Sequence, residues 1–168
     1  MKSKSDEKKT YFKDKITSKI GVLMRRETEV RILIPFLQNL YKEFGKEKII
    51  YILEKTIKEI AKTQGAELSR EYGDNVDAFL DTLKFWTKDG ALEIDILEKS
   101  DLKLSFNVTR CKYAEMYNAL GVSDLGAVLS CNRDASLIRG FNPKASLDRK
   151  ETIMSGDKCC TFRYTFEK

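Results

Sequence analysis

The chain has 168 residues, of which 42% are hydrophobic and 34% charged, and its formal net charge is +5 at pH 7. This composition predicts a soluble globular protein, and no apolar run reaches the roughly 18 residues that a membrane span needs. Histidine is absent, which excludes Ser-His-Asp catalysis, Cys-His catalysis and His-ligated zinc sites.

Lysine and arginine are densest in the first 26 residues, and beyond them the two signs of charge are mixed. We therefore expect a flexible basic arm over residues 1–22, a single domain over residues 23–168, and no nucleic-acid partner. The basic start is not followed by an apolar segment, and the chain has four cysteines. Cysteines without a secretion signal favour free thiols, so we expect a cytoplasmic protein that binds no membrane.

The first half of the chain has the apolar spacing of helices. Apolar residues recur three and four positions apart over residues 27–45, which predicts a helix with a kink near Pro35. Similar patterns predict a second helix over about 46–72 and a third over 76–86.

After Gly90 the apolar period changes from helical to alternating. Alternation over 92–108 predicts a β-hairpin, and two short helices are expected between residues 109 and 131. Two more strands are predicted at about 145–154 and 158–166. This order predicts an α+β fold: about three N-terminal helices packed on a C-terminal antiparallel sheet of about four strands, with two short inserted helices.

Two residues are candidates for chemistry without histidine. Cys111 lies where a predicted strand passes into a helix; the helix N-terminus and the neighbouring Arg110 could lower the pKa of its thiol and make it a nucleophile. Asp134 follows Cys131 by three residues and is a candidate general base for water. The alternatives are a small buried hydrophobe at Cys111 and a surface carboxylate beside Arg133.

Arg110 and four further polar residues are candidates for binding a substrate. Arg149 and Arg163 lie on the last two predicted strands, where a guanidinium could hold a substrate carboxylate or form cross-strand ion pairs instead. Asn142 and Thr152 are candidate liners of a cleft, with roles in a turn and on a strand surface as their alternatives.

The adjacent Cys159 and Cys160 belong to one predicted strand, so their side chains point to opposite faces. Cys160 shares its face with the aromatic residues two, four and six positions later and is expected to point inward. Cys111, Cys131 and one of this pair could hold a metal with Asp134, but no Cys-x-x-Cys spacing occurs. We therefore predict neither a metal nor a cofactor.

Five short motifs recur in order and resemble the L-2-amino-thiazoline-4-carboxylic acid hydrolase family over roughly residues 25–166. They are TRCKYAEMY (109–117), LSCNRD (129–134), FNP (141–143), LDRKETIMSGD (147–157) and CTFRY (160–164). RRETEVRILIPFL (25–37) and AKTQGAEL (61–68) extend the likeness into the helical half. The chain has Lys112 where the family often has proline, and Thr161 where an aspartate is common. The matching motif makes Cys160 a third candidate catalytic residue.

The resemblance implies a hydrolase of non-peptide C–N or C–S bonds in cysteine metabolism, which opens the ring of 2-amino-thiazoline-4-carboxylate to N-carbamoyl-cysteine. The C-terminal half is also similar to the small-molecule-binding domain related to bacterial 4-vinyl reductases, which implies a ligand cavity between helices and sheet. The alternative function is therefore a non-catalytic binding or sensor domain that uses the same cavity. The expected partner is a small molecule, and a homo-oligomer formed through the helical half is a further alternative.

Overall fold

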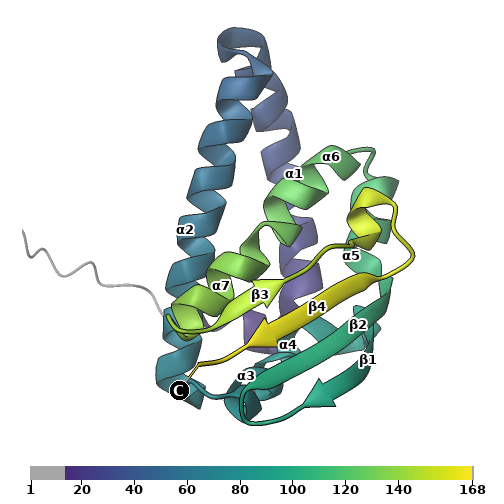
Figure 1. The fold of residues 1–168 in the computed structure, drawn as a ribbon. Helices are drawn as coiled ribbons and strands as arrows, with labels where there is room; N and C mark the ends of the chain where they lie inside the picture. The colour runs from purple at the N-terminus through teal and green to yellow at the C-terminus, as the bar shows by residue number, and fades with distance from the viewer. Residues whose placement is uncertain (1–13, 168) are drawn as a thin grey trace, which may run out of the picture.

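The structure, a computed structural model, describes residues 14–167. Its helices come first and a four-stranded antiparallel sheet follows, with short helices inserted (Figure 1), which confirms the predicted α+β fold. Residues 1–13 of the predicted arm lie outside the described residues, and from Thr17 the chain is helical. None of the helices within residues 14–167 is long and apolar enough to cross a membrane.

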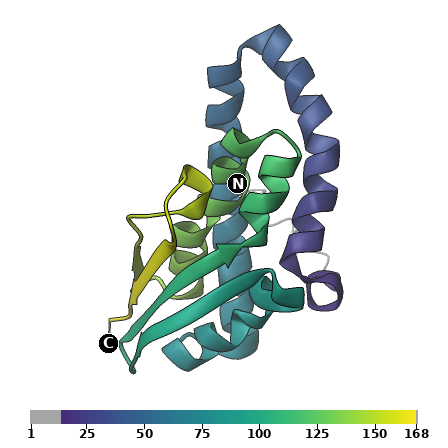
Figure 2. The ribbon, with the colours of Figure 1, turned by 90° about the vertical axis from the view of Figure 1, so that its right-hand side faces the viewer.

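The two longest helices, α1 (Thr17–Phe44) and α2 (Lys46–Tyr72), form a hairpin that extends beyond the sheet (Figure 2). Gly45 joins them with a φ of 83°, in the region that favours glycine. The helix continues across Pro35, where we predicted a kink, and its non-helical dihedral angles occur at Gly21 instead. Pro35 is exposed, so the carbonyl that lacks its N–H partner can bind water.

Two short helices, α3 (Val76–Thr82) and α4 (Lys84–Thr87), replace the single helix predicted over 76–86. The Asn75 side chain caps α3 by accepting a hydrogen bond of 2.9 Å from the backbone N–H three residues later. The short 3₁₀ helix η1 (Lys88–Gly90) then leads into the sheet.

The sheet contains the predicted hairpin and two later strands, in the spatial order β1-β2-β4-β3 with every neighbouring pair antiparallel. The four strands are β1 (Leu92–Lys99), β2 (Lys103–Cys111), β3 (Ser146–Asp148) and β4 (Cys160–Thr165). Cys160 and Tyr164 are buried, so the inward direction predicted for this face of the last strand is confirmed.

The strand predicted over 145–154 is wrong beyond Asp148. Side-chain oxygens accept the hydrogen bonds of the next backbone N–H groups: Thr161 Oγ1 accepts from residues 150 and 151, and Asp157 Oδ2 accepts from residue 152. These bonds replace the ladder of a strand, and the 3₁₀ helix η3 (Ile153–Ser155) follows.

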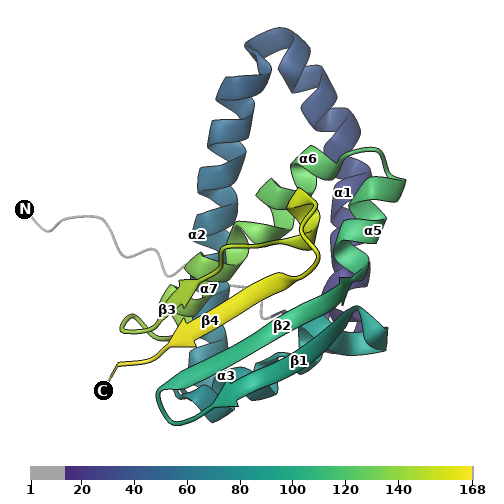
Figure 3. The ribbon, with the colours of Figure 1, turned by 45° about the vertical axis from the view of Figure 1, so that its right-hand side comes forward.

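Between β2 and β3 the chain forms α5 (Lys112–Ala119), α6 (Ser123–Gly126), the π-helical η2 (Ala127–Cys131) and α7 (Arg133–Phe141). The first three occupy the region of the two predicted short helices. The last helix, α7, was not predicted, and it lies alongside α2 (Figure 3).

The crossing of α2 and α7 depends on two glycines. A Cβ atom at Gly65 would lie 2.0 Å from the Leu137 carbonyl oxygen, and one at Gly140 would lie 1.9 Å from the Lys62 carbonyl oxygen. Real side chains do not tolerate such distances, so each glycine lets the backbone of the other helix approach. Ala61, which is completely buried, is a further small residue of α2 in the core that these helices share with the sheet.

We predict that Gly65→Ala and Gly140→Ala each lower the free energy of unfolding by about 1–3 kcal/mol, because the added methyl group forces the helices apart. Thr63→Ala, at an exposed position of α2, is the matched control and should change stability by less than about 0.5 kcal/mol. Urea denaturation measures all three. Wild-type stability in both glycine variants would contradict the close crossing.

Candidate functional site

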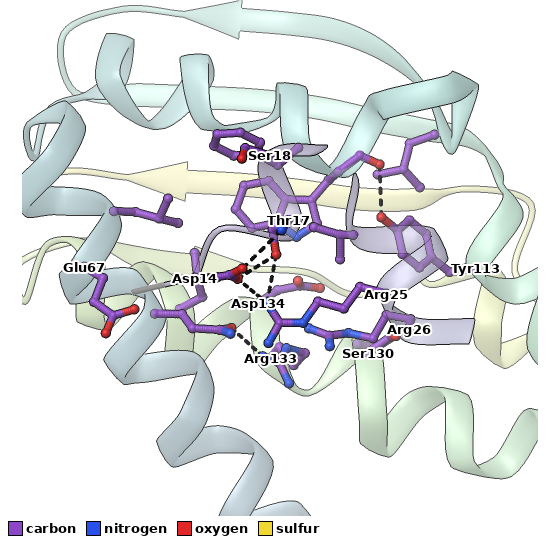
Figure 4. Close-up of a pocket in the computed structure, with 18 of the residues that line it drawn as sticks. Asp14, Thr17, Ser18, Arg25, Arg26, Glu67, Tyr113, Ser130, Arg133 and Asp134 are labelled. Atoms are coloured by element: carbon purple, nitrogen blue, oxygen red, sulfur yellow. Dashed lines mark hydrogen bonds and ion pairs between the residues drawn. The ribbon is translucent and has the colours of Figure 1, made fainter. Parts of the chain in front are cut away.

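A cavity of about 970 Å³ lies among α1, α2, α4, α7 and the sheet. Figure 4 shows polar residues of its wall, among them Arg25, Arg26, Arg133 and Asp134. The remaining lining includes three thiols and an apolar group of side chains: Cys111, Cys131, Cys160, Val22, Leu68, Tyr72, Phe85, Trp86, Leu92, Val108, Leu137, Met154 and Phe162. The cavity wall thus combines apolar side chains with many polar and charged groups, and a concave site that offers both can hold a small organic molecule.

An ion pair between Asp134 and Arg149 forms one part of the wall, and both side chains are largely buried. Arg149 also donates a hydrogen bond of 2.9 Å to the Cys131 carbonyl oxygen, and its guanidinium lies 5.1 Å from the centre of the Phe162 ring. Burial raises the pKa of Asp134 against the opposing attraction of Arg149. Burial lowers the pKa of Arg149, but the nearby Asp134 more than offsets this, so the pKa of Arg149 is raised.

Three further arginines gather at the cavity, as Figure 4 shows. Arg25 forms ion pairs with Asp14 and Glu29, and Arg26 forms one with Glu29. Arg26 and Arg133 are each only 6% exposed, but within the part of the chain that the structure describes only Arg26 has a carboxylate partner.

Arg133 is therefore a buried cation without an ion pair among residues 14–167. It donates a hydrogen bond to the side-chain oxygen of Gln64 on α2. Burial, followed by repulsion from Arg26, lowers the pKa of Arg133 to about 10. A buried guanidinium with a neutral partner is a binding group for an anion that enters the cavity.

The three thiols of the cavity are poor nucleophiles in the free protein. Burial raises the pKa of Cys111, and the backbone N–H groups of Tyr113 and Ala114, which act in the opposite direction, do not reverse the shift. Burial also raises the pKa of Cys131 to about 12 and that of Cys160 to about 11. Our prediction of a lowered pKa for Cys111 is wrong, because desolvation raises the pKa of the thiol by more than the helix N-terminus lowers it.

Four of the predicted site residues thus line one cavity: Cys111, Asp134, Arg149 and Cys160. These four residues lie close together, because the charges of the others influence the pKa values of Cys160 and of the neighbouring Cys131. Within residues 14–167, however, no group of three or more Cys, Asp or Glu side chains is arranged to hold a metal ion.

Two predicted arginines do not reach the cavity. Arg110 is half-exposed and pairs with Glu93 and Glu115 on the surface. Arg163 bonds to the carbonyl oxygen of Phe106 and the side chain of Asn107. The alternation that turns Cys160 inward turns Arg163 to the other face of the sheet.

The two predicted polar liners also lie elsewhere. Asn142 ends α7, where its side chain donates to the Asp74 carbonyl oxygen and accepts from the Lys144 N–H. Thr152 belongs to the turn before β4, and its hydroxyl bonds to Ser155. Neither residue lines the cavity, because Asn142 is held by Asp74 and Lys144 and Thr152 by Ser155, none of which lines it.

Sequence reasoning missed Arg26 and Arg133 as cavity residues, although helical spacing carries a signal for both. Arg26 lies four residues from the buried Val22 and Val30, and Arg133 lies four residues before the buried Leu137. An arginine in register with an apolar stripe faces the interior and needs a partner there.

The family model of L-2-amino-thiazoline-4-carboxylic acid hydrolase matches residues 25–164. This chain belongs to the L-2-amino-thiazoline-4-carboxylic acid hydrolase family. The match confirms the resemblance found in the sequence motifs, and its range includes Arg26, Arg133, Asp134 and Arg149 of the cavity.

No curated protein matches the chain. Among solved structures, this family member is similar to a trafficking protein particle complex subunit 3 from Naegleria fowleri covalently bound to palmitic acid. The two share 14% sequence identity with a TM-score of 0.47, and the similarity covers 86% of this chain and 96% of that chain.

The two cavity arginines should respond differently to removal of their charge. Arg149→Met leaves the buried Asp134 without its partner and should cost about 3 kcal/mol of stability at pH 7. Arg133→Met removes a buried charge that has no ion pair with any other described residue, and it should raise stability by about 1 kcal/mol. Urea denaturation of both variants measures the difference, and a larger loss in Arg133→Met than in Arg149→Met would contradict the assignment.

The Arg149→Met loss should also depend on pH. Without Arg149 the pKa of Asp134, already raised by burial, rises further, so the folded state binds a proton more readily than the unfolded state. The loss should therefore be largest above this pKa and should shrink as the pH is lowered through it.

The raised thiol pKa values predict slow alkylation. In a Cys159→Ser background, iodoacetamide at pH 7 should modify Cys111, Cys131 and Cys160 at least about 10-fold more slowly than a free peptide thiol, because only the thiolate reacts. Peptide mass spectrometry measures each site, and the rates should rise about tenfold per pH unit up to pH 9. If the alkylation rate of Cys111 is already constant below pH 8, the pKa of its thiol is lowered, as we expected from the sequence.

Proposed function

We propose that this protein hydrolyses a small carboxylate-bearing heterocycle or cyclic amidine, as the family name implies for 2-amino-thiazoline-4-carboxylate. The observation that carries the proposal is the position of Asp134 on the cavity wall, held by Arg149 and directly following the buried Arg133, which has no ion pair within residues 14–167. These groups supply a base for water and a cation for the substrate carboxylate.

Arg133 is the group proposed to hold the carboxylate. A guanidinium offers two parallel N–H donors that match a carboxylate, and the bond is strong where water is excluded. Gln64 supports the proposal because it holds the guanidinium of Arg133 from α2. The apolar side chains of the cavity then cover the ring.

Asp134 is proposed to act as the general base. Burial raises its pKa, which makes its carboxylate a stronger base than an exposed one, while Arg149 favours the ionised form and fixes its orientation. The carboxylate takes a proton from water as the water oxygen bonds to the ring carbon between nitrogen and sulfur, and the π electrons of the C=N bond move to the ring nitrogen, which takes that proton from Asp134. The new hydroxyl group then forms a C=O bond as the C–S bond breaks, and the sulfur leaves with the bonding electron pair and takes the proton that the hydroxyl group loses. The product is N-carbamoyl-cysteine.

The proposal assigns the attack to water rather than to the Cys111 thiolate. Burial keeps the thiols of Cys111 and Cys160 protonated at neutral pH, so they contribute shape and polarity to the wall. All four cysteines are free, which supports a reducing compartment, and we propose a role in cysteine metabolism in the cytoplasm.

The assay is consumption of 2-amino-thiazoline-4-carboxylate, followed by the new thiol of the product and by its mass. Asp134→Asn should lower kcat at least about 100-fold because the base is lost, and Arg133→Gln should raise KM about 10-fold or more because a charged hydrogen bond is lost. The exposed Asp148→Asn and Arg139→Gln are matched controls and should leave both constants unchanged. Cys111→Ala should retain most of the activity.

Two results would contradict the proposal. One is the absence of product with any carboxylate-bearing thiazoline or cyclic amidine. The other is full activity in Asp134→Asn together with its loss in Cys111→Ala, which would transfer the attack to the thiol.

The second candidate is a binding or sensing role that uses the same cavity. It is favoured by the raised pKa values of two thiols near Asp134, about 12 for Cys131 and about 11 for Cys160, which make both thiols weak acids for protonating the leaving group. Thermal stabilisation by the thiazoline without any product would select this candidate.

A further inference from the structure

The cavity is much larger than the ring that the family name implies. Its volume is about 970 Å³. The roughly nine non-hydrogen atoms of 2-amino-thiazoline-4-carboxylate would fill only about 270 Å³, even if each took the ~30 Å³ of a water molecule in the liquid. Such a ligand, bound at Arg133 and Asp134, would leave most of the cavity to water.

The additional space has an apolar wall. Phe85 and Trp86 of α4, Leu92 of β1 and Phe162 of β4 all line the cavity and are only half-buried. Trp86 and Leu92 pack against both of the apolar clusters that meet there. Apolar surface that faces a water-filled cavity is unfavourable, and an apolar group of a ligand would remove it from water.

The charged part of the cavity comes from other elements. Arg25 and Arg26 belong to α1 and Arg133 to α7, and Figure 4 shows them gathered together near Asp14 and Asp134, with Glu67 of α2 apart from them. Arg25 and Arg26 are paired with Asp14 and Glu29, so Arg133 is the cation without an ion pair among the described residues, and the cavity combines it with an aromatic and aliphatic wall. A ligand that satisfies both is amphipathic: an anion at one end and an apolar body at the other.

We infer that the site takes a carboxylate that carries an apolar body of roughly ten or more carbon atoms, an alkyl chain or an aryl group, lying along Trp86 and Leu92. For the ring that reacts, the inference rests on the proposed function. The substrate is then a thiazoline carboxylate or cyclic amidine that carries an apolar substituent. With the substituent on the exocyclic nitrogen, water adds across the C=N bond at the same ring carbon, and one of its protons passes to the ring nitrogen. The C–S bond then breaks as the C=O bond forms, with the C–S electron pair and the second proton of water ending on sulfur. The product is then a carbamoyl-cysteine substituted on the terminal nitrogen.

Binding can be tested without any hydrolysis, using acetate, hexanoate and decanoate below their micelle-forming concentrations. Isothermal titration calorimetry should show the affinity rising about three- to fourfold for each CH₂ group buried. Leu92→Trp and Leu68→Trp, which fill the cavity from two different elements, should each remove the gain from the longer chains. Ile96→Trp, at an exposed position of β1, is the matched control and should bind as the wild type does.

Arg133→Gln should weaken the binding of acetate, hexanoate and decanoate by the same factor, because the substitution removes only the contact with the carboxylate. The inference is overturned if affinity does not depend on chain length, or if Leu92→Trp and Leu68→Trp, both shown to be folded by thermal melting, keep the wild-type chain-length dependence.

A kinetic comparison separates this inference from the proposed function. The kcat/KM for 2-(benzylamino)-thiazoline-4-carboxylate should exceed that for the unsubstituted ring by about 10-fold or more, since an aryl group is buried in the transition state. Turnover of both rings without preference, together with weak binding of decanoate, overturns the inference and leaves the proposed function. Tight binding of decanoate without turnover of either ring supports the amphipathic site and overturns the hydrolase.

Discussion

The close crossing of α2 and α7 is the contact on which the site depends. Gly65 and Gly140 bring the two backbones to a distance that no side chain would permit. Gln64 stands beside Gly65 on α2, and the crossing places it where it accepts the hydrogen bond of Arg133, the first residue of α7. Asp134 follows in the same turn. A larger separation of the helices would therefore remove the partner of a buried cation and move the proposed base, in addition to opening the core.

Desolvation is the second constraint, and it decides the protonation of the site. The N-terminus of α5 offers two backbone N–H groups to Cys111, yet burial outweighs them and raises the pKa of the thiol. The same physical cause raises the pKa of Asp134 and lowers that of Arg133 to about 10. In a cavity that disfavours charge in this way, an ionised ligand binds favourably only where it forms an ion pair with a residue of opposite charge. Arg133 can form that pair, because it has no ion pair within residues 14–167.

The strongly periodic parts of the chain could be predicted from the sequence, and the short ones could not. The long apolar stripes of α1 and α2 and the alternation of the hairpin are repeated over many residues, so single exceptions do not hide them. The strand expected after Asp148 does not form because Thr161 and Asp157 accept the backbone N–H groups that a ladder would use. Such competition between side chain and backbone depends on residues 5 to 11 positions away, which the alternation within a strand does not reveal.

By itself, the sequence determined the α+β order, the family, and the inward direction of Cys160, because these follow from periodicity, from motif order and from strand geometry. It also placed Cys111, Asp134, Arg149 and Cys160 among the candidates that line the cavity. Only the tertiary structure decided that Arg133 joins them and that Arg163 does not. It alone decided that the thiols stay protonated, because desolvation and the distance between charges depend on how α1, α2, α7 and the sheet pack together.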